Sequence, residues 1–273
     1  MLFRSMRGPL SHSVTELRLW SLCSCTVSGF LRFLNSFRSL LDLLLRHDIP
    51  SFLRNSGQIL PPPYPLPSRS LMSLYLEVAP GVDKLIEWYI REGSFLARIK
   101  MLNLSWDIEA EGGIHFGVLK SLLHHCMGSL EDLTLTVFSS VNEGPLMEKI
   151  ADNSMLSHIH HASRTNDTPV VLSSLPNLRR MKSWCGHSSV FQIASTQLCS
   201  IREPCKIEDI ILVVSLTIEA KDYEKSRNYC KRIDEALTSD NFPSLRSVQL
   251  FREIPFDYFP TLQSRKLLRV YGS

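Results

Sequence analysis

The chain has 273 residues, of which 44% are hydrophobic and 21% are charged, and its formal net charge at pH 7 is +3. These values are typical of a folded globular chain and exclude a disordered one, and the weak charge gives no indication of nucleic-acid binding. The longest apolar run, Ile210 to Ile218, is much shorter than the roughly 20 residues of a membrane span.

One pattern begins a new segment eight times: an aliphatic residue, two residues of any kind, a second aliphatic residue, one residue of any kind, and a third. We call this pattern the ladder. Its loose form is expected about seven times from composition alone, so the context has to support it. The sixth ladder lacks its third aliphatic residue. The ladders begin at Val14, Leu40, Leu71, Ile99, Leu130, Leu178, Ile207 and Leu245.

The spacing and surroundings of the ladders indicate strands that alternate with helices. Their starts lie 26 to 48 residues apart, the range in which one strand and one helix form a repeat. Pro176 and Pro243 precede two of them, and proline stops a helix and favours extended backbone before it. Each ladder therefore predicts a strand, and the pattern is typical of leucine-rich repeats.

In the first half of the chain, residues 1–13 are predicted to form an N-terminal extension, and Val27–Phe37 a short helix. Five prolines in the seven residues 61–67 predict a stiff loop, which we prefer to a docking site for an SH3 or WW module. Apolar residues at helical spacing predict helices near Val82–Ile90 and Phe116–Cys126.

In the second half, residues 139–167 are predicted to be an insertion or a degenerate repeat, with one helix at 145–162. A further helix is predicted over Tyr223–Leu237, with Asp222 as its cap. One side of this helix carries Tyr223, Ser226, Cys230, Ile233 and Leu237, and the solvent side carries Glu224, Lys225, Arg227, Lys231, Arg232 and Asp234.

The alternation predicts an α/β fold: a leucine-rich-repeat-like solenoid with a parallel sheet on its concave face and helices on its convex face. Residues 14–273 are predicted to form a single domain. Its repeats are expected to be irregular, because no asparagine follows the strands at a regular position.

No catalytic or metal site and no cofactor is predicted. The sequence has no glycine-rich phosphate loop and no nucleophile elbow. His124, His125 and the cluster His158–His161 are interpreted as solvated helix-end residues, and Cys23 and Cys25 as unlinked thiols. An odd count of seven cysteines with no secretory signal indicates reduced thiols and a cytoplasmic or nuclear protein.

The chain resembles the leucine-rich-repeat region of fungal, mainly mushroom-type, F-box proteins. Degenerate ladders such as Val14–Leu19 and Phe37–Leu43 carry the resemblance, together with the C-terminal segment Phe259–Val270. It implies repeats that recruit a substrate to a cullin-based ubiquitin ligase. An F-box needs about forty residues, whereas the first ladder begins at Val14, so the F-box is expected to be missing and contact with the ligase adaptor is not expected.

We therefore predict a non-catalytic protein-protein interaction module of F-box-like type with an unknown protein partner, and no nucleic acid or membrane. The alternative is a structural or regulatory leucine-rich-repeat protein with no ubiquitin-ligase role.

Strand side chains that alternate with the ladder are expected to line the concave face. The candidate binding residues are Trp20, Arg46, Tyr75, Arg180 and Trp184, since aromatic and arginine side chains dominate hot spots. For each, the alternative is that it only solvates the sheet.

Overall fold

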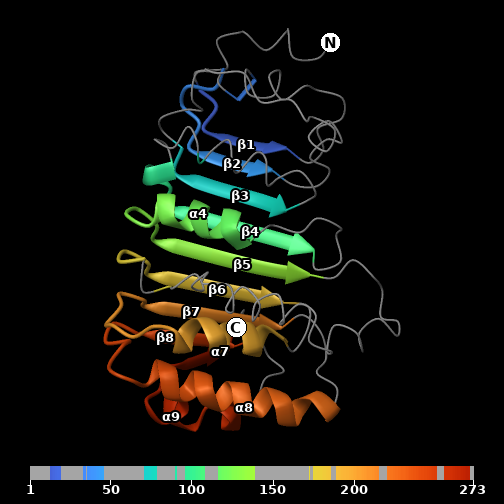
Figure 1. Cartoon of the computed structure of the whole chain (residues 1–273), viewed down its shortest axis with the longest axis vertical. Coiled ribbons are helices and arrows are strands. Elements are labelled where there is room, and N and C mark those ends of the chain that lie inside the picture. The colour runs from blue at the N-terminus through green and yellow to red at the C-terminus, as the bar shows by residue number, and fades with distance from the viewer. Residues whose placement is uncertain are drawn as a thin grey trace. The chain divides into compact units, whose positions relative to one another are not determined.

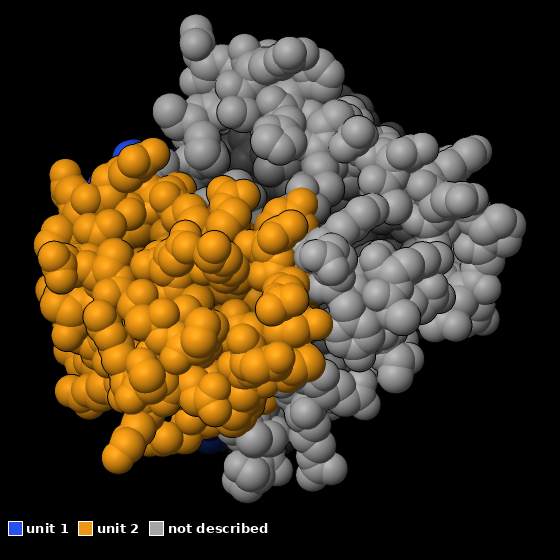
Figure 2. Space-filling model, turned by 90° about the horizontal axis from the view of Figure 1, so that it is seen from below, with its two compact units in different colours: residues 1–130 blue, residues 131–273 orange. Residues whose placement is uncertain are grey.

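A computed structural model describes residues 13–19, 33–34, 36–45, 71–78, 90, 96–107, 116–138, 172, 175–185, 189–214, 220–250 and 255–270. The chain divides into two compact units, unit 1 with residues 1–130 and unit 2 with residues 131–273. The described part of unit 2 is a compact body in the space-filling view (Figure 2).

Unit 1 is built on parallel strands that pair in the order in which they follow along the chain (Figure 1). The strands are β1 (Glu16–Leu19), β2 (Asp42–Leu45), β3 (Ser73–Val78) and β4 (Met101–Asp107). A 3-10 helix, η3 (Leu96–Arg98), precedes β4, and the helix α4 (Phe116–Cys126) follows it. Because neighbouring strands are parallel, each connection has to bring the chain back to the same end of the sheet before the next strand begins.

Unit 2 repeats this arrangement with β5 (Asp132–Phe138), β6 (Arg180–Cys185), β7 (Asp209–Val214), β8 (Ser247–Leu250) and β9 (Leu268–Val270). All are parallel and pair consecutively. Its helices are α7 (Ser189–Cys199), α8 (Ala220–Leu237), α9 (Pro260–Ser264) and the 3-10 helix η5 (Phe256–Tyr258). The predicted α/β class with a parallel sheet is confirmed.

The ladder residues form the core. All eight predicted strands are present, and each begins two residues after the first residue of its ladder. From Leu40 onward the aliphatic ladder residues are at most 4% exposed, with Leu245 as the exception. Val14, Leu17 and Leu19 are only partly buried. Their strand, β1, has a neighbour on one side only among the described residues, so less protein covers it.

A recurring backbone contact fixes the register from one repeat to the next. Two consecutive amides before or at the start of a strand donate to one carbonyl of the preceding repeat. The amides of Arg179 and Arg180 donate to the carbonyl of Glu131 at 2.8 and 3.0 Å, and those of Glu208 and Asp209 to Arg179 at 2.7 and 3.1 Å. The two residues between the first and second ladder positions are thereby held at the start of the strand, where their backbone donors are satisfied.

The helices are partly as predicted. α4 has the predicted bounds, whereas α8 begins at Ala220, so Asp222 lies in its first turn and is not its cap. α7 and β9 were not predicted. Of the predicted helix at 27–37 only residues 33–34 and 36–37 are described, and 33–34 are helical. The predicted helix at 82–90 lies outside the described residues except for Ile90, and the helix at 145–162 and the loop at 61–67 lie wholly outside them.

Asp234 was wrongly placed on the solvent side of its helix. Its side chain belongs to the core, since the residue is 2% exposed, and its carboxylate accepts hydrogen bonds from the backbone amides of Thr261 (Oδ2, 3.0 Å) and Leu262 (Oδ1, 2.8 Å). These amides open α9 and have no partner within the helix. The carboxylate therefore replaces the missing capping side chain, because the N-cap residue of α9 is Phe259, which makes no side-chain cap.

The C-terminal end of α9 is closed by a residue in the left-handed backbone conformation. Lys266 has φ 59°, and the amide of Leu267 donates to the carbonyl of Leu262 at 3.0 Å. This is the Schellman arrangement, in which glycine is the usual residue. It turns the chain from α9 directly into β9.

In the described part of the chain, no helix is long and apolar enough to cross a membrane.

Candidate protein-binding surface

Each strand presents a second set of side chains, which alternate with the ladder, and we call the surface that they form the non-ladder face. In unit 1 it carries Tyr75, half-buried on β3, which pairs in register with Leu44 on β2 and Asn103 on β4. Asn103 Oδ1 is buried and has no hydrogen-bond partner among the described residues, and Ser105 is 3% exposed. This part of the face is therefore polar but well covered.

In unit 2 the first row of the non-ladder face alternates in charge. Asp132, Arg180, Asp209 and Ser247 are neighbours in register across β5 to β8. Asp132 Oδ2 lies 3.4 Å from Arg180 Nε, and Ser247 Oγ donates to Asp209 Oδ1 at 2.7 Å. The Arg180 side chain is 61% exposed, whereas that of Asp132 is 18% exposed. The carboxylates thus lie low in the sheet and the guanidinium projects from it.

Burial raises the pKa of the Asp132 carboxyl above its usual value, and the positive charges of Arg180 and Lys182 lower it in part. Desolvation disfavours the charged form of a carboxyl, and nearby cations favour it. The two cations therefore lie beside one recessed carboxylate, and Asp209 on β7 is the register neighbour of Arg180.

The second row of the face runs Thr134, Lys182, Ile211, Gln249 and Arg269 across β5 to β9. Arg269 is exposed, and its Nη1 donates to the carbonyls of Lys266 and Leu268 at 3.2 and 3.3 Å. Ile211 and Gln249 are half-buried. The row therefore has a cation on β6, a cation on β9 and an apolar position between them.

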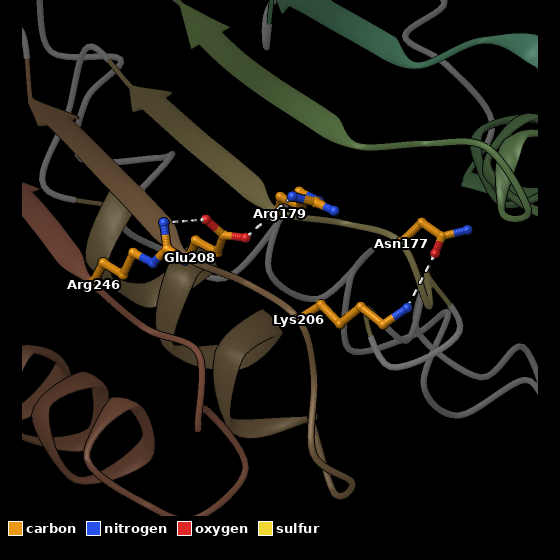
Figure 3. A network of polar contacts seen from close by, with 5 residues as sticks. All are labelled: Asn177, Arg179, Lys206, Glu208 and Arg246. Atoms are coloured by element: carbon orange, nitrogen blue, oxygen red, sulfur yellow. Dashed lines mark hydrogen bonds and ion pairs between the residues drawn. The ribbon is translucent and has the colours of Figure 1, made fainter.

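The residues directly before the strands of unit 2 form a charged rim, consisting of Glu131, Arg179, Glu208 and Arg246. Glu208 contacts both arginines: Oε1 lies 3.4 Å from Arg179 Nη1 and Oε2 lies 3.1 Å from Arg246 Nη1 (Figure 3). The acidic and basic residues alternate from strand to strand. Opposite charges on adjacent strands favour the observed pairing order over a shifted one.

The structure places the five predicted binding residues as follows. Arg180 and Trp184 occupy non-ladder positions of the same strand, β6, while Tyr75 occupies a non-ladder position of β3 in unit 1. Trp20 and Arg46 lie outside the described residues. Arg180 is the only one of the five with an exposed side chain among those whose burial the structure describes.

Sequence reasoning did not select the charged rim or Arg269. The rim has a readable signal, because acidic and basic residues alternate at the position before each of the last four ladder-derived strands. Arg269 had no such signal, because β9 follows no complete ladder and its strand was not predicted. Lys182 lies at a predicted concave position, but only arginine and aromatic residues were selected there.

The histidines and cysteines of the described part form no assembled site. His124 is exposed in the last turn of α4, and His125 Nδ1 lies 2.7 Å from the carbonyl of Ser121. Burial raises the pKa of the Cys126 thiol to about 12 and also raises that of Cys230. In the described ranges, no three His, Cys, Asp or Glu residues are grouped to hold a metal ion.

Neither the protein-family models nor the curated proteins contain a match to this chain. The fold itself defines the class of molecule: an α/β protein with consecutive parallel strands, ladder residues on one face and a charged non-ladder face in unit 2.

Proposed function

We propose that the chain is a non-catalytic protein-protein interaction module of leucine-rich-repeat type that acts in the cytoplasm or nucleus. The non-ladder face, concave in such a solenoid, is the binding surface. The observation that carries the proposal is the difference between the two sides of each strand: aliphatic ladder residues are buried, while the alternating positions of unit 2 hold mainly charged and polar side chains, with Ile211 and Val213 as apolar members. Such rows arranged on rigid strands provide an extended docking surface.

We further propose that the module recruits substrates in the manner of the repeat region of fungal F-box proteins. The support is the sequence resemblance, in which degenerate ladders and a C-terminal closing segment recur. The structure adds the closing segment's architecture, with α9 and β9 joined at Lys266 and attached to α8 through Asp234. This part of the proposal requires a ubiquitin ligase in the same assembly.

Affinity purification of the tagged full chain with mass spectrometry tests both parts. We expect proteins that are captured by the wild-type chain and lost with Arg180→Glu, because this change reverses the most exposed charge of the first row. Arg227→Glu is the matched control, since Arg227 is exposed on α8, away from the strands. Capture of nothing above the tag-only background contradicts the interaction function. Partners without any ligase subunit contradict only the F-box-like part.

A further inference from the structure

We infer that the second row of the non-ladder face in unit 2 binds an extended protein segment with two carboxylate side chains four residues apart and an aliphatic side chain midway between them. The inference rests on the proposed interaction function and names the chemistry of its partner. Three observations carry it: the sign of the exposed charge, the position of the recessed acids, and the spacing of the cations.

The exposed charge of this face is positive. Arg180 and Arg269 are exposed, and Lys182, two residues after Arg180 on β6, is half-buried. The acidic members of the face are Asp132, 18% exposed, and Asp209, which is half-buried and accepts the Ser247 hydroxyl at 2.7 Å. A partner that approaches from solvent therefore meets Arg180 and Arg269 before it meets the carboxylates, and complementary charge favours an acidic partner.

Arg180 is oriented for a second carboxylate. Its contact with Asp132 uses Nε, at 3.4 Å, and is its only ion pair within the part of the chain that the structure describes. The two terminal nitrogens form no hydrogen bond with described residues. A guanidinium binds a carboxylate best through two parallel N–H donors, and an arginine already held in place loses less side-chain freedom on binding.

The spacing of the cations matches an extended peptide. Lys182 on β6 and Arg269 on β9 are separated by three strand-to-strand steps through Ile211 and Gln249. At about 4.8 Å per step the separation is roughly 14 Å. Four residues of an extended chain span about 13 Å, with residues i, i+2 and i+4 on one side. Acidic side chains at i and i+4 then reach the two cations, and an aliphatic side chain at i+2 covers Ile211.

The same layout disfavours nucleic acid. A phosphate backbone carries a charge on every nucleotide and would lie against the carboxylates of Asp132 and Asp209 as well as against the cations. A peptide with separated charges along the second row avoids this repulsion, because the residue that covers Ile211, two positions along β7 from Asp209, is uncharged.

Titration of the isotope-labelled full chain by NMR with short peptides tests the inference. The probe is Ser-Glu-Ser-Val-Ser-Glu-Ser, and its controls are the peptide with both glutamates replaced by glutamine and a peptide with the two glutamates adjacent. We expect saturable shifts of the backbone amides of Lys182, Ile211 and Gln249 with the probe. Binding should be at least about tenfold weaker for the glutamine peptide, and weaker for the adjacent-glutamate peptide. It should weaken as NaCl rises from about 0.05 to 0.5 M, because salt screens exposed charges.

Arg269→Glu and Lys182→Glu should each lower the affinity for the probe about tenfold or more, and Arg227→Glu should leave it unchanged. Arg269→Gln, which keeps the polar side chain, covers the case in which the charge reversal disturbs β9. Absence of probe binding by the folded chain, equal binding of the glutamine peptide, or tighter binding of a dT oligonucleotide overturns the inference. A protein partner whose capture is insensitive to Lys182→Glu and Arg269→Glu also overturns it, while the proposed interaction function stands.

Discussion

Replacing Asp234 by alanine is expected to detach the C-terminal closing segment. The carboxylate is 2% exposed and receives two backbone N–H groups, from Thr261 at 3.0 Å and from Leu262 at 2.8 Å. Asp234→Ala removes the acceptor of both donors, and the hydrogen bond from Leu262 is buried while that from Thr261 is part-buried. An unsatisfied buried donor costs about 1–3 kcal/mol, and loss of a helix cap costs about 0.5–2 kcal/mol. Since these contributions overlap, we expect the free energy of unfolding to fall by roughly 2–4 kcal/mol.

Asp234→Asn separates the two hydrogen bonds. The asparagine oxygen can accept from one amide, but its NH2 group cannot accept from the other. We therefore expect about half the loss seen with alanine. The matched control is Glu235→Ala, because Glu235 is exposed and its side chain makes only a 4.0 Å ion pair with Lys231 among the described residues. Its effect should stay within about 0.5 kcal/mol.

The assay is urea denaturation, combined with amide hydrogen exchange to locate the change. Protection should be lost first at Thr261 and Leu262 and in β9, because α9 buries Leu262 and leads directly into that strand. A loss below about 0.5 kcal/mol for Asp234→Ala, equal to that of the control, would refute the reasoning. So would unchanged protection of the two amides.

Four further predictions concern single residues. Lys266→Gly should raise the free energy of unfolding by about 0.5–1 kcal/mol in urea denaturation, since φ 59° disfavours any residue with a Cβ, and Lys266→Ala should not raise it. Cys126, whose thiol pKa is raised to about 12, should resist iodoacetamide at pH 8 in the native protein and react after unfolding, as mass spectrometry can show. Burial raises the folded-state pKa of Asp132, so its stabilising contribution is complete below the unfolded pKa of about 4 and is lost as pH rises through the folded pKa. Wild-type stability measured against Asp132→Asn should therefore fall as pH rises above about 4, and a rise would contradict the sign. Glu208→Gln should cost only about 0.5–1 kcal/mol, because both arginines that contact it are well exposed, and a much larger loss would show that the rim is a stronger determinant of stability than its exposure indicates.

The strands were predictable because their signal is local. Each ladder places aliphatic residues at the first, fourth and sixth positions, and only a short turn followed by a strand points all three to one side. The burial of Leu71, Leu74 and Leu76, each at most 1% exposed, follows directly from this geometry. The same reasoning fixed the parallel order, since units of one strand and one helix stack consecutively.

Other elements were missed for identifiable reasons. The buried side of α7 consists of Phe191, Ala194, Ser195 and Leu198, and two of these four residues are small, so the helical apolar pattern is weak. β9 has three residues and no full ladder before it. Asp234 was placed on the solvent side because acidic residues are rarely buried, and the amides that it caps are 27 and 28 residues further along the chain.

The sequence by itself determined the repeat period, the eight ladder strands, their parallel order and the alternation of buried and non-ladder positions. These properties depend on contacts within a repeat or between consecutive repeats. The tertiary structure decided which charges stand out from the sheet, since Asp132 and Asp209 are recessed while Arg180 and Arg269 are exposed. It also decided how the C-terminal segment is held, because Asp234 of α8 caps the start of α9 and Lys266 ends that helix. The physical reason is that the exposure of a polar group depends on its neighbours in space, which residue spacing along the chain does not specify.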